Sequence, residues 1–315
     1  MRILFTGGSS FTGSWFVREL ARGGHEVTAV FRRAAADYPD ETRRRRVALA
    51  AEASRAVHGL SFGDERFLSL VRSERFDLLA HHAADVTNYR SPDFDPFAAL
   101  QANAKNLPQV LSALADSGCR RVVLTGSVFE GGEGAGSEGL PDFSPYGLSK
   151  ALTSQAFRYY CGRAGLALGK FVIPNPFGPY EDPRYTAYLL KSWFGGETPS
   201  CNNPSYVRDN IHVSLLARVY RAFVEGLPAA AGLYRIGPSG YPESQGAFTL
   251  RLASEMRPRL GLPCPVELRR QVEFPEPRVR INVDVPDASA LGWSESAAWD
   301  DMAHYYEGLY RTRRP

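Results

Sequence analysis

The sequence TGGSSFTG at residues 6–13 decides the fold of this chain of 315 residues. It follows directly on an apolar run at 2–5 that predicts a buried strand, and it opens a helical pattern over 11–22. Glycines between a strand and a helix allow a tight turn and let the backbone approach a pyrophosphate at the positive end of the helix. We therefore expect a dinucleotide-binding turn here, with a plain tight turn as the simpler alternative.

Strand-like and helical segments alternate through the first 175 residues. The predicted strands lie at 2–5, 27–31, 60–62, 77–80, 122–125 and 168–173, and the predicted helices at 11–22, 65–72, 96–117 and 145–164. This alternation predicts an α/β Rossmann fold, in which a doubly wound parallel sheet is covered by helices on both faces. Pro108 falls inside the third helix and predicts a kink or a break there.

The pattern loosens after residue 174. Prolines and glycines cluster at 174–183, 195–204 and 237–246, and helical patterns return at 212–225 and 297–311. We predict that 1–174 form the dinucleotide-binding domain and that 209–237 return to it. We predict that 175–208 and 238–315 form mainly a smaller, loop-rich substrate-binding lobe.

Composition sets limits on the class of protein. A net charge of +3 is too small to indicate nucleic-acid binding, and no run approaches the eighteen apolar residues that span a membrane. The four arginines at 43–46 are expected to form a solvated helix or loop face, with a partner-binding patch as the alternative. Because the chain opens directly on a strand, we expect no signal peptide. Four widely spaced cysteines without a nearby histidine cluster predict reduced thiols in the cytoplasm, with neither disulfides nor a metal site: Cys119, Cys161, Cys201 and Cys264.

The end of the second predicted strand indicates which nicotinamide cofactor would fit. An NAD site normally carries an acid there, but the chain reads VFRR at 30–33 and has no acid until Asp37. A guanidinium such as that of Arg32 suits a 2′-phosphate, so NADP(H) is favoured over NAD(H); the alternative is that both arginines face solvent. Further on, Asp64 could accept from the adenine amino group, and the small residues of HAA at 82–84 would pass close to the cofactor.

Tyr146 and Lys150 lie four residues apart in SPYGLSK at 144–150, which places them on one face of a helix. Pro145 suits the first helical position, and Ser144 is a plausible N-cap. A phenol has a pKa near ~10, and a nearby ammonium favours the phenolate. The pair is typical of acid/base chemistry, although an exposed helix face can show the same spacing.

These motifs together resemble the extended short-chain dehydrogenase/reductase family, the NAD-dependent epimerase/dehydratases, over nearly the whole chain. Ser10 departs from the family's T-G-G-x-G-F-x-G turn; its Cβ could crowd the phosphates or its hydroxyl could bond to one. The other matching segments, in chain order, are HAA at 82–84, Asn103, Tyr146 with Lys150, NPFGP at 175–179, RDNIHV at 208–213, Arg278, Asp284 and LGW at 291–293.

The resemblance implies roles for individual residues. Tyr146 would give or take the hydroxyl proton, and Lys150 would hold the nicotinamide ribose and keep the tyrosine acidic. A serine or threonine would bond the substrate oxygen: alignment on the fifth strand selects Ser127, and alignment on the later aromatic selects Thr125. We prefer Ser127, because a strand end positions a side chain more rigidly than a variable loop does. Asn103 would be the fourth catalytic member, or else a helix asparagine that bonds nearby backbone.

The same resemblance implies the binding residues. The substrate diphosphate would be held by Asn175, Arg208 and Arg278, although each arginine could instead form a surface salt bridge. The cofactor would be contacted by Gly7, Ser9, Ser10, Phe11, Thr12, Gly13, Arg32, Asp64, His82, Ala83, Ala84, Lys150 and Pro174.

The residues next to Ser127 in the sequence reduce the number of reactions that fit this chain. Family members that dehydrate sugars carry an Asp-Glu pair there, whereas this chain has only Glu130 nearby. A 4-epimerase that retains NAD and a ketoreductase that consumes NADPH remain, and Arg32 favours the ketoreductase. Its substrate would be a nucleotide-activated 4-keto sugar, although some relatives reduce aglycone or polyketide carbonyls. A redox sensor that binds NADP without chemistry would typically lack Tyr146 and Lys150. Family members often pair through two long helices, here 96–117 and 145–164, so we expect a homodimer.

Overall fold

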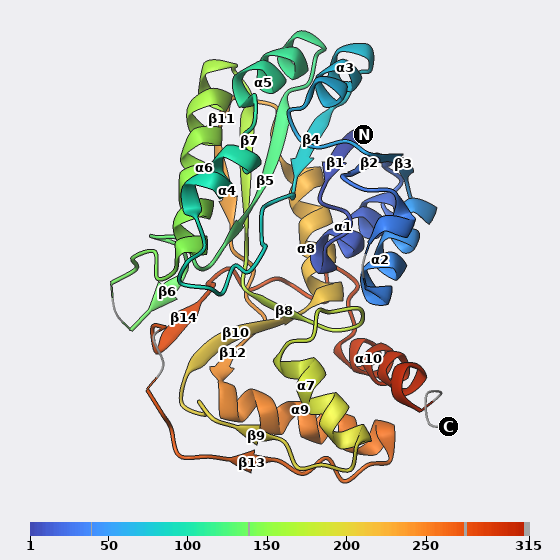
Figure 1. Cartoon of the computed structure of the whole chain (residues 1–315), viewed down its shortest axis with the longest axis vertical. Coiled ribbons are helices and arrows are strands. Elements are labelled where there is room, and N and C mark those ends of the chain that lie inside the picture. The colour runs from blue at the N-terminus through green and yellow to red at the C-terminus, as the bar shows by residue number, and fades with distance from the viewer. Residues whose placement is uncertain (39, 138, 274–275, 312–315) are drawn as a thin grey trace. The chain divides into compact units, whose positions relative to one another are not determined.

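The computed structural model describes residues 1–311 apart from 39, 138 and 274–275 (Figure 1). The chain divides into two units. The first comprises Met1–Glu133, Leu140–Ile173 and Ala217–Gly237, and the second comprises Gly134–Gly139, Pro174–Leu216 and Pro238–Pro315. The return to the first unit thus begins at Ala217, where the sequence had suggested 209.

The first unit is built on a seven-stranded sheet in the order β11-β7-β5-β4-β1-β2-β3, and its neighbouring strands pair in parallel. This order confirms the predicted doubly wound Rossmann fold. The strands are β1 (Arg2–Thr6), β2 (Glu26–Phe31), β3 (Arg55–His58), β4 (Leu78–His81), β5 (Arg121–Ser127), β7 (Ala167–Ile173) and β11 (Gly232–Ile236). The helices are α1 (Phe11–Arg22), α2 (Glu41–Glu52), α3 (Glu65–Ser73), α4 (Pro96–Asn103), α5 (Leu107–Asp116), α6 (Pro145–Arg163) and, from Ala217 onward, α8 (Val213–Gly226), with a short 3-10 helix at Ala35–Asp37.

Helices cover both faces of this sheet. One core cluster joins α3, α5 and α6 to the strands, and it includes Phe67, Leu111 and Phe157. A separate aromatic group joins α1 and α8 to β7: the rings of Phe16 and Tyr220 stack at 4.0 Å between centroids, and Phe171 packs edge-on against both. The sequence therefore places apolar side chains on both faces of the central strands, as a doubly wound sheet requires.

One local prediction is wrong, and another holds only in part. The third strand lies at Arg55–His58, where Val57 pairs with Val30, and the apolar stretch at 60–62 packs into the core without forming a strand. The arginine run lies on α2, but its face is not fully solvated. Arg46 is only 1% exposed, and its guanidinium carbon lies 5.7 Å from the centroid of the Phe11 ring, because α2 packs against α1.

The predicted break near Pro108 is confirmed. Helix α4 ends at Asn103, Asn106 adopts φ of 50°, and Pro108 lies in the first turn of α5. Proline is tolerated in a first turn because the N–H that it lacks would have no partner within the helix. The helix that ends at Asn103 and the helix that carries Pro108 are thus separate elements.

The second unit contains a sheet in the order β12-β10-β14-β6, with β8 also paired to β10, and a two-stranded pair of β13 and β9. Its strands are β6 (Ala135–Gly136), β8 (Asn175–Phe177), β9 (Ser200–Cys201), β10 (Val207–His212), β12 (Tyr241–Ser244), β13 (Glu267–Leu268) and β14 (Val279–Ile281). Its helices are α7 (Tyr185–Phe194), α9 (Gln245–Leu260) and α10 (Glu295–Tyr310). They enclose a core that includes Phe248, Trp299 and Tyr306. In the part of the chain that the structure describes, no helix combines the length and apolar character needed to cross a membrane.

Candidate active site

The glycine turn lies where the strand order of the sheet reverses, between β1 and its two neighbours β2 and β4. Ligands of doubly wound folds bind outside the carboxyl ends of the strands at this point. Gly7 has φ of +87°, and a Cβ on it would lie 2.7 Å from the Ala83 nitrogen. A Cβ on Gly13 would lie 2.2 Å from the Gly7 oxygen. These glycines keep the turn tight and the backbone bare at the N-terminus of α1, which fits a bound dinucleotide pyrophosphate.

Ser10, the departure from the family motif, is the N-cap of α1. Its hydroxyl accepts from the Gly13 N–H at 3.1 Å and donates to the Gly7 carbonyl at 2.9 Å. It also lies 3.0 Å from Nε2 of His82. The hydroxyl is therefore engaged inside the turn, so the serine supports the turn that a glycine would otherwise form.

His82 links three segments of the first unit. Its Nε2 lies 3.0 Å from the Ser10 hydroxyl and 3.1 Å from the Thr12 hydroxyl, and its Nδ1 lies 2.8 Å from the Thr125 hydroxyl. Burial, followed by the charges of Lys150 and His81, lowers the pKa of His82 to about 3. The ring is therefore neutral, and because Ser10 donates to Gly7, Nε2 carries the proton and Nδ1 accepts from Thr125. Sequence reasoning did not identify this connecting role.

Thr125 and Ser127, the two candidates for the substrate-bonding hydroxyl, have different surroundings. The Thr125 side chain is 4% exposed and is occupied by His82, and its carbonyl accepts from the Lys150 ammonium at 2.5 Å. Ser127 ends β5 and is half-buried, and its hydroxyl accepts from the Phe129 N–H at 3.2 Å. A hydroxyl that accepts from backbone keeps its own proton to donate, so Ser127 has the geometry that we expect of the substrate-bonding group.

Tyr146 and Lys150 lie in the first two turns of α6. Ser144 is the N-cap of this helix and accepts from the Gly147 N–H at 3.0 Å, and Pro145 occupies its first turn, as predicted. A Cβ on Gly147 would lie 2.3 Å from the Phe129 carbonyl oxygen, so the start of the helix is pressed against the loop after β5. The Tyr146 ring packs among aromatic rings at centroid distances of 5.2–6.3 Å: those of Tyr89, Phe94 and Phe129.

Lys150 is 5% exposed, and its environment favours loss of its proton. Burial lowers its pKa to about 8; Glu130 acts in the opposite direction, and Lys170 adds to the lowering. An ammonium whose pKa lies this close to neutrality can exchange its proton in the working range of an enzyme. The phenol and the ammonium are thus placed by one helix, and the ammonium is anchored to the end of β5 through Thr125.

Asn103 acts on backbone of the same unit. Its Oδ1 accepts from the Asp85 N–H at 2.8 Å, and its Nδ2 lies 3.4 Å from the Thr153 hydroxyl on α6. Its carbonyl oxygen lies 3.1 Å from Nε2 of His81. The side chain therefore holds the segment after β4 against α6, which is the backbone-bonding alternative raised from sequence.

The two residues predicted near the adenosine half of the cofactor have distinct settings. The Asp64 carboxylate is the N-cap of α3 and accepts from the Phe67 N–H at 2.7 Å and the Ser61 N–H at 2.9 Å. Arg32 follows β2 and is exposed. Among the described residues, its guanidinium has no hydrogen-bond or ion-pair partner.

The candidate substrate residues lie in the second unit and differ from one another. Asn175 of β8 has a buried Nδ2 without a partner in the described part of the chain. Arg208 of β10 is held by its own chain: it donates to the carbonyls of Val207 and Pro277 at 2.9 Å and pairs with Glu276 at 2.9 Å. Arg278 is exposed. For Arg208 the structure thus shows the salt bridge that was the alternative to a ligand contact.

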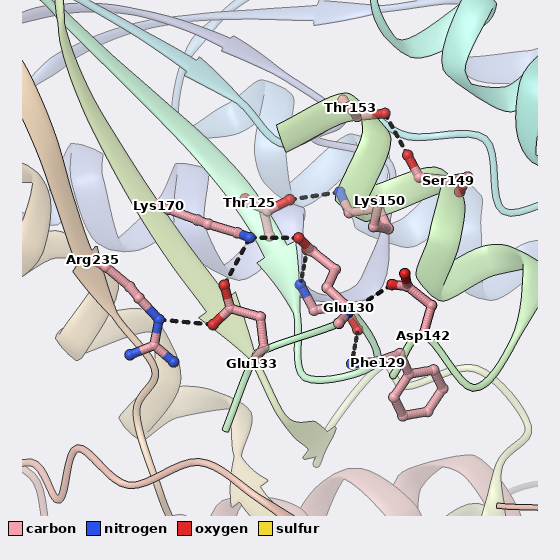
Figure 2. A network of polar contacts seen from close by, with 12 residues as sticks. Thr125, Phe129, Glu130, Glu133, Asp142, Ser149, Lys150, Thr153, Lys170 and Arg235 are labelled. Carbon is pink, nitrogen blue, oxygen red and sulfur yellow. Dashed lines mark hydrogen bonds and ion pairs between the residues drawn. The ribbon is translucent and has the colours of Figure 1, made fainter. Parts of the chain in front are cut away.

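An ion network beside the end of β5 was not predicted; its members Glu130, Glu133 and Lys170 are buried, and Arg235 is exposed (Figure 2). The Lys170 ammonium lies 2.5 Å from Glu130 and 2.8 Å from Glu133, and Arg235 lies 2.7 Å from Glu133. The available signal was Lys170 itself, because a lysine inside the apolar strand LGKFVI requires a buried partner.

Comparison with known proteins identifies the family of this chain. A model of the NAD dependent epimerase/dehydratase family matches residues 3–237. A search of curated proteins finds no match. Among solved structures, UDP-glucose 4-epimerase of Thermotoga maritima with UDP-glucose is 20% identical over 98% of this chain and 99% of its own, with a TM-score of 0.70.

Two further solved structures cover the chain equally well. The dTDP-glucose 4,6-dehydratase of Streptomyces venezuelae, with NAD bound, is 23% identical over the whole of both chains, with a TM-score of 0.70. UDP-glucuronic acid 4-epimerase of Bacillus cereus, with UDP-glucuronic acid and NAD, is 18% identical over 98% of this chain and 100% of its own, with a TM-score of 0.72. At these identities the likeness establishes the fold. Because the family model matches most of the length, the chain belongs to the NAD dependent epimerase/dehydratase family.

Proposed function

We propose that this protein is a ketoreductase that uses NADPH to reduce a nucleotide-activated 4-keto sugar. The observation that carries the proposal is the arrangement of three groups at one end of the sheet. Tyr146 and Lys150 lie on one face of α6, and Lys150 is bonded to the end of β5, two residues before Ser127. The glycine turn is connected to the same strand through His82.

The chemistry follows from these positions. Bound NADPH supplies the hydride. The carbonyl carbon of the sugar accepts it, and the oxygen takes a proton from Tyr146, which yields an alcohol. Lys150 stabilises the phenolate that remains, and the Ser127 hydroxyl donates to the substrate oxygen as charge develops there.

The preference for NADPH rests on Arg32. The end of β2 carries no acid, and the exposed guanidinium has no other partner among the described residues. A 2′-phosphate would supply the missing counter-charge through charge-assisted hydrogen bonds. Asp64 and the segment at 82–84 would complete the adenosine and nicotinamide contacts, with Pro174 after β7.

A nucleotide sugar is favoured by family membership and by Asn175. Its buried Nδ2 has no partner among the residues that the structure describes, and a buried donor left unpaired is costly unless a ligand satisfies it. The exposed Arg278 would bind the diphosphate, whereas Arg208 would first have to leave Glu276. We further propose a cytoplasmic homodimer. Phe97 on α4 is 69% exposed and Tyr159 on α6 is 58% exposed, which supports pairing through these helices.

The cofactor released from freshly purified protein tests the proposal. We expect little retained nucleotide, and we expect NADPH to bind about tenfold or more tightly than NADH, the value of a charge-assisted bond. Arg32→Ala should remove this preference, and Arg33→Ala, an exposed neighbour, should keep it. Tightly retained NAD would instead identify a 4-epimerase, and binding without turnover of any carbonyl would identify a sensor.

A further inference from the structure

Glu130 closes the turn that carries Ser127. Its carboxylate is fully buried, and Oε1 accepts from the Ser127 N–H at 2.7 Å while the Glu130 N–H donates to the Ser127 carbonyl at 3.0 Å. Two hydrogen bonds of opposite direction between Ser127 and Glu130 therefore hold the turn. Gly126 leaves the space for this contact, because a Cβ there would lie 2.8 Å from Glu130 Oε1 and 2.8 Å from the Lys170 Cε.

The second carboxylate oxygen of Glu130 pairs with Lys170 at 2.5 Å. Lys170 already has another buried counter-ion, because Glu133 lies 2.8 Å from it, and Glu133 is itself paired with Arg235 at 2.7 Å. The two carboxylates and the two cations of this network therefore balance in charge, as buried charges require. Glu130 in addition accepts from the Ser127 N–H, so it joins the network to the turn after β5.

The same carboxylate and Lys150 both bind the end of β5. Oε1 of Glu130 accepts from the Ser127 N–H, and the Lys150 ammonium donates to the Thr125 carbonyl, two residues earlier (Figure 2). The charge of Glu130 opposes the loss of the Lys150 proton, and that of Lys170 promotes it. The other titratable groups that act with Lys150 are His81 and His82, both neutral because burial lowers their pKa to about 3. Tyr146 lies one helical turn away on α6. Glu130 and Lys170 are therefore the charged pair that acts on Lys150.

We propose that Glu130 is a positioning residue for the reaction: one carboxylate oxygen fixes Ser127, and the Glu130–Lys170 pair balances the charge around the Lys150 ammonium. This inference rests on the proposed function for the roles of Ser127 and Lys150. Sequence comparison alone would not reveal it, because the two partners lie 40 residues apart on different elements.

Lysine NMR tests the charge balance without any turnover. The chain has four lysines, Lys105, Lys150, Lys170 and Lys191, so ¹³Cε-lysine labelling gives a spectrum simple enough to follow each side chain with pH. Glu130→Gln should move the Lys150 titration to lower pH by roughly 1 unit, the size of a neighbouring-charge effect, and Lys170→Met should move it to higher pH.

Glu133→Gln is the matched control, because it removes a carboxylate from the same network without touching Ser127. It should move the Lys150 titration less than Glu130→Gln does. Opposite shifts in the first two variants cannot come from general loosening of the fold. Equal shifts in Glu130→Gln and Glu133→Gln, or no shift in Glu130→Gln, would overturn the proposal. If Lys170→Met does not fold, comparison of Glu130→Gln with Glu133→Gln still tests the proposal.

Glu130→Asp tests the positioning of Ser127. It keeps the charge but shortens the side chain, so the Lys150 titration should stay near that of the parent while kcat falls about tenfold or more and KM changes little. Unchanged kcat would refute the positioning role. If the unaltered protein turns over no carbonyl but the NMR shifts appear as stated, the proposed function fails and the charge balance at Lys150 stands.

Discussion

Thr125→Val and Ser127→Ala should affect different properties, because only one of these hydroxyls is free to meet a substrate. The Thr125 hydroxyl lies 2.8 Å from Nδ1 of His82 and is buried. Valine fills the same volume without a donor and leaves the His82 nitrogen unsatisfied. That loss costs about 1–3 kcal/mol of unfolding free energy, or several degrees of Tm for a domain of this size. We expect kcat to change little.

Ser127→Ala should give the reverse result. The side chain is half-buried at the strand end, and its hydroxyl accepts a bond of 3.2 Å from the Phe129 N–H, so its removal costs little stability. A donor that stabilises developing negative charge contributes about 10²–10³-fold to kcat, or about 2.7–4 kcal/mol. We therefore expect a loss of that size in kcat with an unchanged Tm.

The assay is NADPH oxidation with a panel of UDP- and dTDP-activated 4-keto sugars, combined with thermal unfolding of each variant. Tyr146→Phe serves as the inactive reference. A large loss of kcat in Thr125→Val with Ser127→Ala close to the parent would refute the assignment of the two hydroxyls. Equal loss of Tm in both variants would refute the structural role given to the bond between Thr125 and His82.

Three further predictions concern the turn, the tyrosine and the buried histidines. Tyr146→Phe should abolish turnover and leave NADPH affinity, measured by calorimetry, nearly intact; an active variant would contradict the proton-transfer role. Gly13→Ala should lower both Tm and NADPH affinity, because its Cβ would lie 2.2 Å from the Gly7 oxygen; unchanged affinity would contradict the close-packed turn. His81 and His82 have folded pKa values of about 3, below the ordinary 6.5, so the unfolded chain binds protons that the folded chain does not between these limits. Stability should therefore be full above pH 6.5 and fall as the pH drops below it, approaching about 1.4 kcal/mol per pH unit for each histidine in urea unfolding. Burial lowers the pKa of His212 to about 3 as well, so His82→Gln should remove roughly a third of the histidine slope; a flat profile would contradict buried neutral rings.

Local patterns in the sequence predicted much of the first unit. The strand–turn–helix at the glycines, the N-cap at Ser144 and the break near Pro108 each depend on a few neighbouring residues, and each appears in the structure. The third strand was misplaced because the apolar stretch at 60–62 is buried like a strand but packs as a loop. Apolar periodicity reports burial, and it does not distinguish these two cases.

The features that sequence reasoning missed depend on contacts between distant residues. Arg46 is covered because α2 packs against α1, and a run of arginines alone indicates only charge. Lys170 and Glu130 meet across 40 residues. Arg208 matched a ligand-binding motif, yet its guanidinium is held by Glu276, 68 residues away. A local sequence pattern does not indicate which distant residues pair with one another.

Transfer of deuterium from [4,4-²H₂]NADPH, labelled on both faces of the nicotinamide, tests the central claim most directly. In a single turnover with a nucleotide-activated 4-keto sugar, the account predicts that mass spectrometry finds the deuterium on the former carbonyl carbon of the product. Tyr146→Phe should bind the labelled cofactor and give no labelled product. If the 4-keto sugar stays unreduced with NADPH unconsumed, while the protein retains NAD and inverts C4 of the corresponding 4-hydroxy nucleotide sugar, the reductase account is contradicted.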